Sequence, residues 1–400
     1  MAVSTDPKKI EELLTRGVEE VIVADHLREQ LKSGKQLRIK FGIDPTSPYM
    51  HLGHTVPLRK LRQFQDLGHR AILIIGDATA MIGDPTGRKE ARKKLTRTEI
   101  DQNKKTYVEQ AGNILNLDKL EIRHNGEWFD PMSAREYLEL TSLVSATQLL
   151  QREDFAARLS DEENPLNALE LAYPMMQGYD SVMVQADVEL GGHDQKLNLL
   201  MGRKIQKKFS MPEQDIMTVP LIEGTDGVRK MSKSFGNSIA LQDSPKDMFA
   251  KVMSIPDELI VRYYTLLTDV ALDRVREIEQ TMNGGGNPRD TKAQLGWELV
   301  RMYHSSAEAD QARDAFDALF RERQIPADIP EHRIDAATSV VDVLVASGLA
   351  KSKSEARRLI EGGGVKVGED VVEDPERILK PSDEGIILQK GKRHFVRVIQ

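Results

Sequence analysis

The sequence predicts an α/β protein in which a parallel sheet is followed by an all-α domain and a small α+β domain. Two apolar stretches at 36–44 and 70–78 have the pattern of buried strands, and the amphipathic stretch at 55–69 lies between them. A strand, a helix and a strand with short joints form the βαβ unit of a parallel sheet, whose ligands bind at the carboxyl ends of the strands. From 244 to about 323 the pattern is helical throughout, and after 336 helices are expected first and short strands later.

Composition limits the class of protein. The 400 residues exceed one ordinary compact domain, so two or three domains are expected. With 40% hydrophobic and 30% charged residues, the chain has no apolar run of membrane-spanning length. The absence of cysteine excludes disulfides, cysteine-ligated zinc and thiol catalysis, and the first residues lack the apolar core of a signal peptide. We therefore expect a cytoplasmic protein.

Further segments complete the predicted organisation. Apolar stretches at 186–192 and 215–222 add two strands to the sheet, and the stretch at 324–335, with two prolines and little apolar content, has the composition of a linker. The predicted division is a sheet domain at 1–235 with a mostly helical insertion at about 88–185, an all-α domain at 236–323, a linker at 324–335 and a small α+β domain at 336–400.

The joint between the first strand and the first helix, DPTSPYMHLGHTVPL, has the features of an anion site. Two prolines delay the helix. His51, Gly53 and His54 then fall at its first turn, where unpaired N–H groups and the helix dipole favour an anion. The histidines could instead only decorate the helix start or bind a metal, but no third ligand and no HExxH pattern lies nearby. Phosphate binding is the interpretation we favour.

A second cationic segment, VRKMSKSFGN at 228–237, follows the last predicted strand. Its pattern fits neither a helix nor a strand, and glycines lie within it and before it. A solvated charged loop is the ordinary interpretation of a single such stretch. The alternative is a hinged loop that carries Lys230 and Lys233 to an anion.

HLGH after a strand, paired with KMSKS at 230–234 after the last sheet strand, resembles the double signature of the class I aminoacyl-tRNA synthetases. The resemblance covers nearly the whole chain and implies a Rossmann-like catalytic domain that uses ATP with Mg²⁺ and has no dedicated protein metal site. In that family the lysine-rich loop closes over ATP and stabilises the developing pyrophosphate, which agrees with the need for cations where phosphate charge accumulates. The catalytic residues implied are His51, His54, Lys230, Lys233 and Thr46.

The segment LAYPMMQGYDSVMVQADVELGGHDQKLNLL at 171–200 resembles the tyrosyl-tRNA synthetases. That resemblance implies a tyrosine site with acceptors for the substrate ammonium and with Asp180 as acceptor for the phenolic O–H. Taken singly, these positions could be ordinary half-buried helix or turn residues. The tyrosine-binding residues implied are Asp84, Tyr173, Gln177, Asp180 and Gln195, and the ATP-binding residues implied are Asp44, Gly53, Asp194, Met231, Ser232 and Lys233.

One departure from the tyrosyl pattern concerns the phenol. Many tyrosyl enzymes have a tyrosine just before the GxDPT segment that also contacts the phenol, whereas this chain has Lys40 and Phe41 there. KFGIDPT resembles the second bacterial subfamily. The full set of phenol contacts therefore stays open at this point.

Three alternatives compete with tyrosine activation. Tryptophanyl enzymes share the fold and a GxDQ element, but YPMMQGYD argues against them. Other nucleotidyltransferases with an HxGH motif are shorter and lack RNA-binding appendages. A non-catalytic RNA-binding paralogue would be expected to have decayed motifs, whereas both stand intact here.

The C-terminal segment VVDVLVASGLAKSKSEARRLIEGGGVKVGEDVV resembles the S-four-type RNA-binding domain. The resemblance implies tRNA as a partner, an all-α domain that reaches the anticodon, and a homodimer interface in the insertion. Cations in such a domain mainly contact phosphates. Arg88, Lys89 and Arg92 could guide ATP or the tRNA end, or could simply be solvated. The RNA-binding residues implied are Arg357, Arg358, Lys390, Lys392 and Arg393.

Overall fold

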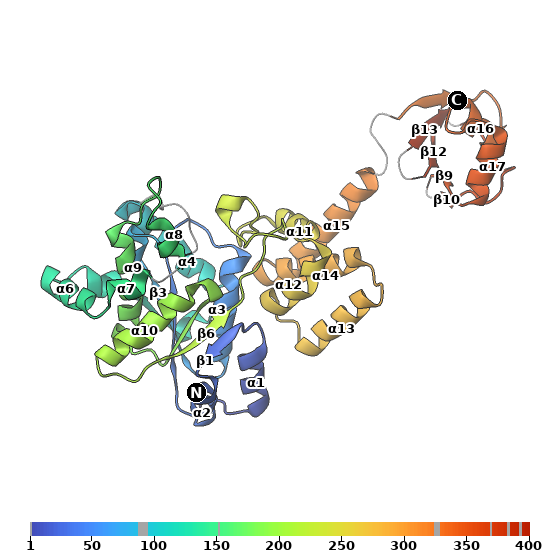
Figure 1. Cartoon of the computed structure of the whole chain (residues 1–400). Helices are drawn as coiled ribbons and strands as arrows, with labels where there is room; N and C mark the ends of the chain where they lie inside the picture. Colours follow the sequence, from blue (N-terminus) through green and yellow to red (C-terminus); the bar gives the residue numbers. More distant parts are fainter. Residues whose placement is uncertain are drawn as a thin grey trace. The chain divides into compact units, whose positions relative to one another are not determined.

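The computed structural model describes residues 2–86, 95–150, 153–323, 329–368, 370–381, 385–391 and 394–400. The chain divides into two units, Met1–Arg313 and Asp314–Gln400 (Figure 1). Within the described ranges, no helix combines the length and the apolar character that a membrane crossing requires.

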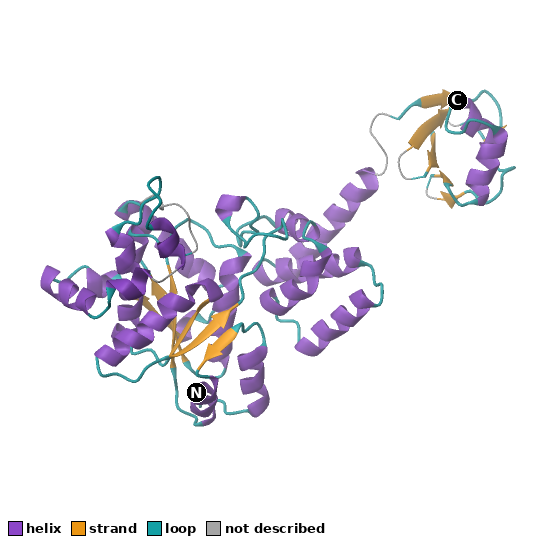
Figure 2. Cartoon of the chain, in the orientation of Figure 1, coloured by secondary structure: helices purple, strands orange, loops and turns teal. Residues whose placement is uncertain are grey.

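A six-stranded sheet lies inside the first unit (Figure 2). Its strand order is β1-β6-β5-β2-β3-β4, with β2 to β6 parallel and β1 antiparallel to β6. The order reverses between β2 and β5, which is where an open α/β sheet binds ligands. The strands are β1 Glu20–Ile22, β2 Arg38–Ile43, β3 Arg70–Ile75, β4 Leu120–His124, β5 Val188–Gly192 and β6 Asp215–Val219. The α/β class and the four predicted strands, β2, β3, β5 and β6, are confirmed.

Two strands of this sheet, β1 and β4, lack the sequence signal of the others. β1 has three residues and β4 reads LEIRH, and all their residues are only partly buried. Both lie at an edge of the sheet, where a strand needs no continuous apolar run. β4 falls inside the insertion predicted at about 88–185, so that segment is not wholly an insertion and contributes to the sheet.

Helices cover the sheet and one of them carries the predicted anion site. α3, Leu52–Asp66, begins directly after His51 and packs on β2, β3 and β5. It ends before Gly68, whose φ of +91° suits glycine. The other helices of this part are α1 Pro7–Thr15, α2 Ala24–Lys32, α4 Arg97–Ala111, α5 Gly126–Phe129, α6 Ala134–Ser142, α7 Ala146–Leu150, α8 Glu153–Arg158, α9 Ala168–Met183 and α10 Lys196–Lys208.

The segment after the sheet is helical, as predicted. α12 packs against α3 and α14, and α11 packs against α14, so this helical part touches the helix that begins at the predicted anion site. The helices are α11 Pro245–Met253, α12 Ile260–Leu267, α13 Leu272–Asn283, α14 Pro288–Tyr303 and α15 Ser306–Arg323.

The second unit contains a small α+β domain, as predicted. A five-stranded sheet of order β10-β9-β12-β13-β7 and a two-stranded sheet of β8 and β11 accompany two helices around a common apolar core. The elements are β7 Glu331–Arg333, β8 Thr338–Ser339, α16 Val340–Ala346, α17 Lys353–Glu361, β9 Val365–Val367, β10 Asp370–Val371, β11 Ile378–Leu379, β12 Ile386–Lys390 and β13 His394–Ile399.

The linker predicted at 324–335 is wrong over its second half. β7 pairs in parallel with β13, and Ile329 and Ile334 on either side of it are buried. Strands therefore also precede the two helices of this domain. β7 escapes a composition-based interpretation because EHR is polar and lies at the sheet edge. Residues 324–328 lie outside the described ranges.

Candidate active site

A cavity of about 320 Å³ lies at the carboxyl ends of the parallel strands and the start of α3. Residues that are far apart in the sequence meet in it, including the HLGH turn and the first residues of the lysine-rich segment. The predicted residues among its lining are Asp44, Thr46, His51, Gly53, His54, Asp84, Tyr173, Gln177, Asp180, Asp194, Gln195, Lys230, Met231 and Ser232.

The two histidines cap α3 and also line the cavity. His51 Nδ1 accepts the Gly53 N–H at 3.2 Å, and His54 Nδ1 accepts the His51 N–H at 3.1 Å. Burial, with His54 and Lys233 nearby, lowers the pKa of His51 to about 2, so its ring is neutral. A neutral ring whose Nδ1 accepts carries its proton on Nε2. His51 is therefore a hydrogen-bond donor at its other nitrogen. Among the described side chains no group of three or more His, Asp or Glu could hold a metal ion.

Asp180 forms the buried inner end of the cavity. The Trp128 Nε1–H donates to its Oδ1 at 2.9 Å, and the Asn125 Nδ2–H donates to its Oδ2 at 3.4 Å. Burial raises the pKa of Asp180 to about 7, while Lys40 and these two donors oppose the rise. A carboxylate so placed is a selective acceptor for a hydroxyl that enters the cavity.

Lys40, which stands where many tyrosyl enzymes have a tyrosine, is not among the residues that line the cavity. Its Nζ lies 2.8 Å from Glu189 Oε1 and donates to the Gln177 carbonyl and to Ser181 Oγ, at 2.7 and 2.8 Å. The side chains of Lys40 and Glu189 are 0% and 1% exposed. Glu189 Oε1 also accepts from Gln177 Nε2 at 3.2 Å. The pair of Lys40 and Glu189 therefore holds α9 at Gln177, which belongs to the predicted tyrosine site, and at Ser181.

A second group links the predicted tyrosine and ATP residues. Tyr173 donates its hydroxyl to Asp44 Oδ2 at 2.9 Å, and Thr79 Oγ1 donates to Asp44 Oδ1 at 2.8 Å. A Cβ at Gly76 would lie 2.1 Å from Asp44 Oδ1, so this close approach requires glycine. Asp44 is thus held from both sides at the end of β2.

Asp84 and Gln195, both predicted for the tyrosine site, are paired with each other. Gln195 Nε2 donates to Asp84 Oδ2 at 2.7 Å, and Gln195 Oε1 accepts from Asn198 at 2.9 Å. Residues more than a hundred positions apart are therefore joined by one short chain of hydrogen bonds in the cavity wall.

The two lysines of the lysine-rich segment differ in their position relative to the cavity. Lys230 lines the cavity and pairs with Asp194 Oδ2 at 2.9 Å. Lys233 is not among the lining residues; its Nζ contacts Ser47 Oγ and the Tyr49 carbonyl and lies 3.4 Å from the centre of the Tyr49 ring. Burial lowers the pKa of Lys233 to about 8. Lys233 therefore stands beside the cavity, held by the loop that follows β2.

The loop that carries these lysines is held by hydrogen bonds of one asparagine side chain and contains two glycines with positive φ. The Asn237 side chain accepts the Ser232 N–H at 2.9 Å and donates to the Arg229 carbonyl at 3.2 Å. Gly227 and Gly236 have φ values of +69° and +67°, which suit glycine. The prediction that this segment is neither a regular helix nor a strand is confirmed, apart from a 3₁₀ turn at Lys233–Phe235.

The predicted RNA-binding residues lie in the second unit. Arg357 and Arg358 are exposed on α17, and Arg357 pairs with Glu376 at 3.4 Å. Lys390, at the end of β12, donates to the Leu349 carbonyl and lies 3.4 Å from Glu355. Lys392 and Arg393 lie outside the described residues, as do Arg88, Lys89 and Arg92.

Several residues of the site escape sequence reasoning. Asn125 and Trp128, which hold Asp180, follow β4 directly. Recognising β4 as a strand would have placed them at the carboxyl end of the sheet, where ligands bind. Thr79 and Glu189 carry no comparable signal, because each is defined only by its partner across the fold.

Comparison with known families accounts for most of the chain. Residues 32–321 match the family described as tRNA synthetases class I (W and Y), and residues 340–384 match the S4 domain. The tyrosine--tRNA ligase of Thermotoga maritima is 47% identical over 393 residues, which cover 98% of each protein. The tyrosine--tRNA ligase of Carboxydothermus hydrogenoformans is 47% identical over 399 residues, which cover 97% of each.

Solved structures share the fold at lower identity. A tyrosyl-tRNA synthetase from Archaeoglobus fulgidus, complexed with L-tyrosine, is 20% identical with a TM-score of 0.63, covering 76% of this chain and 99% of that one. A tryptophanyl-tRNA synthetase from Plasmodium falciparum is 16% identical with a TM-score of 0.59, covering 79% and 90%. At these identities the likeness concerns the fold alone.

Proposed function

The chain belongs to the class I tRNA synthetases of the tryptophan and tyrosine family, and we propose that it acts as a tyrosine–tRNA ligase. It activates tyrosine with ATP to tyrosyl-adenylate and pyrophosphate, then transfers tyrosine to the terminal adenosine of its tRNA. One observation carries the choice of tyrosine. The carboxyl group of Asp180 is buried at the inner end of the same cavity that the HLGH turn and Lys230 line.

Tyrosine enters with its phenol toward Asp180, which accepts the O–H. Tyr173, Gln177 and Asp84 supply acceptors for the ammonium group, and Gln195 holds Asp84 by the 2.7 Å hydrogen bond. A phenylalanine in this place would leave Asp180 with an unfilled acceptor position in a buried site. That loss disfavours it, by a rule for which the tyrosyl enzymes are themselves the worked example.

ATP, with Mg²⁺ as part of the substrate, occupies the outer half of the cavity. Asp194 suits the ribose hydroxyls, Asp44 and Thr46 lie beside the nucleotide, and Gly53 permits close packing. Met231 and Ser232 complete this wall. The tyrosine carboxylate attacks the α-phosphate and pyrophosphate leaves, so no side-chain nucleophile takes part.

Positive charge and N–H donors act where the pyrophosphate develops. Neutral His51 offers its Nε2–H, and His54 is its partner at the start of α3, where the helix dipole also favours an anion. Lys230 and Lys233 reach the phosphates when the loop moves from its contacts with Asp194, Ser47 and Tyr49. Such cations act mainly in the transition state.

Transfer requires tRNA, and the S4 domain is the expected partner surface. Arg357, Arg358, Lys390, Lys392 and Arg393 contact phosphates and contribute affinity more than sequence choice. A cytoplasmic homodimer with its interface at about 88–185 and an anticodon contact from the 236–323 domain belong to the same proposal, on the family resemblance.

The decisive experiment is pyrophosphate exchange with ATP by the purified chain without tRNA. Exchange should depend on tyrosine and should be absent with phenylalanine. Exchange supported by tryptophan and not by tyrosine would move the chain to the other branch of its family. Exchange that needs no amino acid would exclude amino-acid activation.

The role of the second unit is tested by ending the chain at Arg323, the last residue of α15, because β7 belongs to the small domain. Tyrosine-dependent exchange should persist and tRNA charging should fall. The slope of log affinity for tRNA against log salt should become shallower by about 0.7–0.9 for each phosphate that the S4 domain no longer neutralises. An unchanged slope would remove the S4 domain from tRNA binding.

A further inference from the structure

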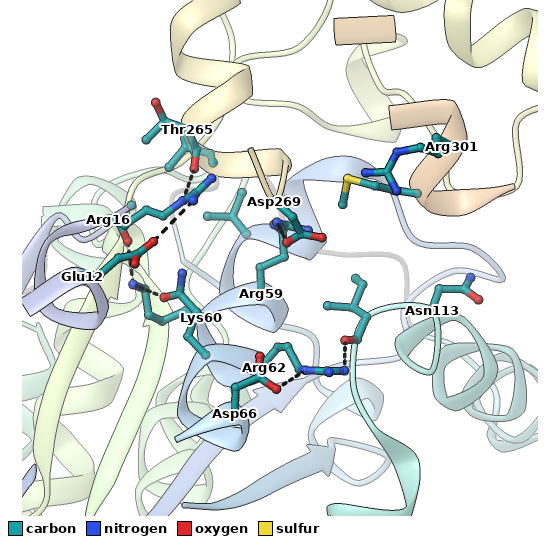
Figure 3. A pocket seen from close by; sticks show the side chains of 16 residues that line it. Glu12, Arg16, Arg59, Lys60, Arg62, Asp66, Asn113, Thr265, Asp269 and Arg301 are labelled. Atoms are coloured by element: carbon teal, nitrogen blue, oxygen red, sulfur yellow. Dashed lines mark hydrogen bonds and ion pairs between the residues drawn. The ribbon is translucent and has the colours of Figure 1, made fainter. Parts of the chain in front are cut away.

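A second cavity, of about 540 Å³, lies in the first unit (Figure 3). It is formed by the end of α1, by α3 from Val56 onward, by the segment that follows α4, by the end of α12 with the residues after it, and by the end of α14. Among the described residues none lines both this cavity and the active-site cavity. α3 serves both cavities: Gly53, His54 and Pro57 line the active site, and Val56 with the residues from Arg59 to Asp66 line this one. The proposed function gives this second cavity no role.

Cations outnumber acids around this cavity. Its lining contains five basic side chains and three acidic ones. The acids, Glu12, Asp66 and Asp269, are 50%, 60% and 73% exposed at the side chain. Two of the arginines are far more enclosed, at 8% for Arg16 and 14% for Arg59. The basic residues are Arg16, Arg59, Lys60, Arg62 and Arg301.

The deepest cations are held mainly by backbone carbonyls, and Arg16 also pairs with Glu12 at 3.6 Å. Arg16 donates to the Thr265 and Thr268 carbonyls at 3.2 and 2.7 Å, and Lys60 donates to the Leu13 and Arg16 carbonyls at 2.8 and 2.6 Å. Carbonyl dipoles orient a cation without cancelling its charge. Burial, with a smaller contribution from Arg16, lowers the pKa of Lys60 to about 7, while Glu12 opposes this shift.

The remaining cations have partners that an anion could replace. Arg59 pairs with Asp269, Arg62 donates to Asp66 Oδ1 at 2.7 Å and to the Ile114 carbonyl at 3.1 Å, and Arg301 pairs with Glu298 at 2.9 Å. Figure 3 shows Arg59, Arg62 and Arg301 around one space, from two different parts of the unit. Asp66 and Asp269 are themselves exposed, and the Arg62–Asp66 pair, exposed on both sides, contributes at most about 1 kcal/mol.

We propose that this cavity binds a small phosphorylated anion, of which inorganic phosphate is the simplest member. Guanidinium groups bind phosphate through paired N–H donors, and such charge-assisted bonds are stronger than those to neutral groups. The volume exceeds that of one phosphate and falls in the range of small-molecule sites, roughly 300–1,000 Å³. Gln63, Asn113 and the apolar side chains of Val56, Leu266 and Met302 remain for the rest of such a ligand.

Phosphate of the RNA backbone suits this cavity less well. An RNA strand is contacted by cations that stand out from a surface, whereas Arg16, Arg59 and Lys60 are recessed. Because the lining comes from α1 and α3 on one side and from the 265–269 segment and α14 on the other, a bound anion would also tie these elements together.

The test is a titration of the full chain with inorganic phosphate at constant ionic strength, followed by calorimetry and by the melting temperature. One saturable site per chain is expected. The double variant Arg62→Gln/Arg301→Gln should bind about tenfold more weakly or worse, since two charge-assisted donors to the anion are removed. Both side chains are about two-fifths exposed, so the fold should persist.

Two matched variants locate the site. Arg276→Gln removes an exposed arginine on α13, outside the cavity, and should leave phosphate binding unchanged. Lys233→Ala alters the active site and should leave it unchanged as well. The proposal is overturned if no saturable binding occurs, if Arg62→Gln/Arg301→Gln binds phosphate normally, or if Lys233→Ala abolishes binding. It is also overturned if the double variant loses affinity for tRNA while the parent chain binds no phosphate, since the cavity would then belong to RNA.

Discussion

The two ends of the active-site cavity differ in how deeply their charged residues are buried. At the inner end Asp180 is buried and accepts from Trp128 of α5, and the buried pair of Lys40 and Glu189, which does not line the cavity, holds α9 by hydrogen bonds. At the outer end Lys230 is 43% exposed, and Val228 on the same loop is 82% exposed. The inner end can select a ligand because its charged groups are buried and held by hydrogen bonds. The outer end can change conformation during the reaction. The present contacts of its cations can be replaced by contacts to phosphate at little cost in free energy.

This difference in burial assigns substrate selection to the inner end and the acceleration of the reaction to the loop. A buried ion pair positions its neighbours, but the removal of one partner leaves an uncompensated charge in the interior. A cation on an exposed loop contributes little to folding and much to a transition state that gathers charge. Substitutions at the inner end should therefore damage stability and substrate choice, and substitutions on the loop should damage rate.

The largest effect is expected at the inner end. Lys40→Met leaves Glu189 buried without its cation, and the free energy of unfolding should fall by about 3–5 kcal/mol. Urea denaturation followed by fluorescence measures this. Lys40→Met/Glu189→Met should recover most of the stability, because apolar side chains of similar volume are tolerated at such sites. The folded double variant should still have a raised KM for tyrosine, since Gln177 loses its brace.

The control for this prediction is a second Lys–acid pair near the sheet. Lys35 pairs with Asp187 at 2.9 Å, but its side chain is 57% exposed. Lys35→Met should change the free energy of unfolding by no more than about 1 kcal/mol. Equal costs for Lys35→Met and Lys40→Met would show that the burial of the inner pair has no energetic consequence.

The next effect belongs to the loop. Lys233→Ala should slow adenylate formation about 10²–10³-fold, the usual cost of removing one group that stabilises transition-state charge. Tyrosine affinity without ATP should hardly change, because Lys233 does not line the cavity. Single-turnover kinetics and equilibrium dialysis separate the two quantities. Lys246→Ala, an exposed lysine at the start of α11, is the matched control. Equal losses of rate and of tyrosine affinity would make the loop a structural part of the inner end.

The smallest effect sharpens the chemistry of the inner end. Because burial raises the pKa of Asp180, the carboxylate is protonated below about pH 7 and is then a poorer acceptor for the phenol. The KM for tyrosine should therefore rise as pH falls below about 7, by at most about tenfold per pH unit, as expected for one proton. Asn125→Ala removes a donor to the carboxylate and should move the midpoint to higher pH. A KM that stays flat from pH 8 to pH 6 would assign the phenol to another acceptor.

Features that depend on neighbours along the chain could be predicted from the sequence. The strand, helix and strand around HLGH, the irregular lysine-rich segment with its glycines and the helical run after Ser244 all follow from local pattern. The family resemblance then predicted the residues of the active site. In the structure all of them except Lys233 line the cavity.

Isolated polar residues find their partners only in the folded molecule. Lys40 could have faced the substrate, and its bonds to Ser181 and Glu189 were set by residues about 140 to 150 positions away. The edge strands β4 and β7 became visible only through pairing with β3 and β13. The cations of the second cavity come from three separated stretches of the chain. One cause is common to these cases: a buried charge or a polar edge strand is stable only with a partner, and the chain folds that partner into place from a distance that no local pattern encodes.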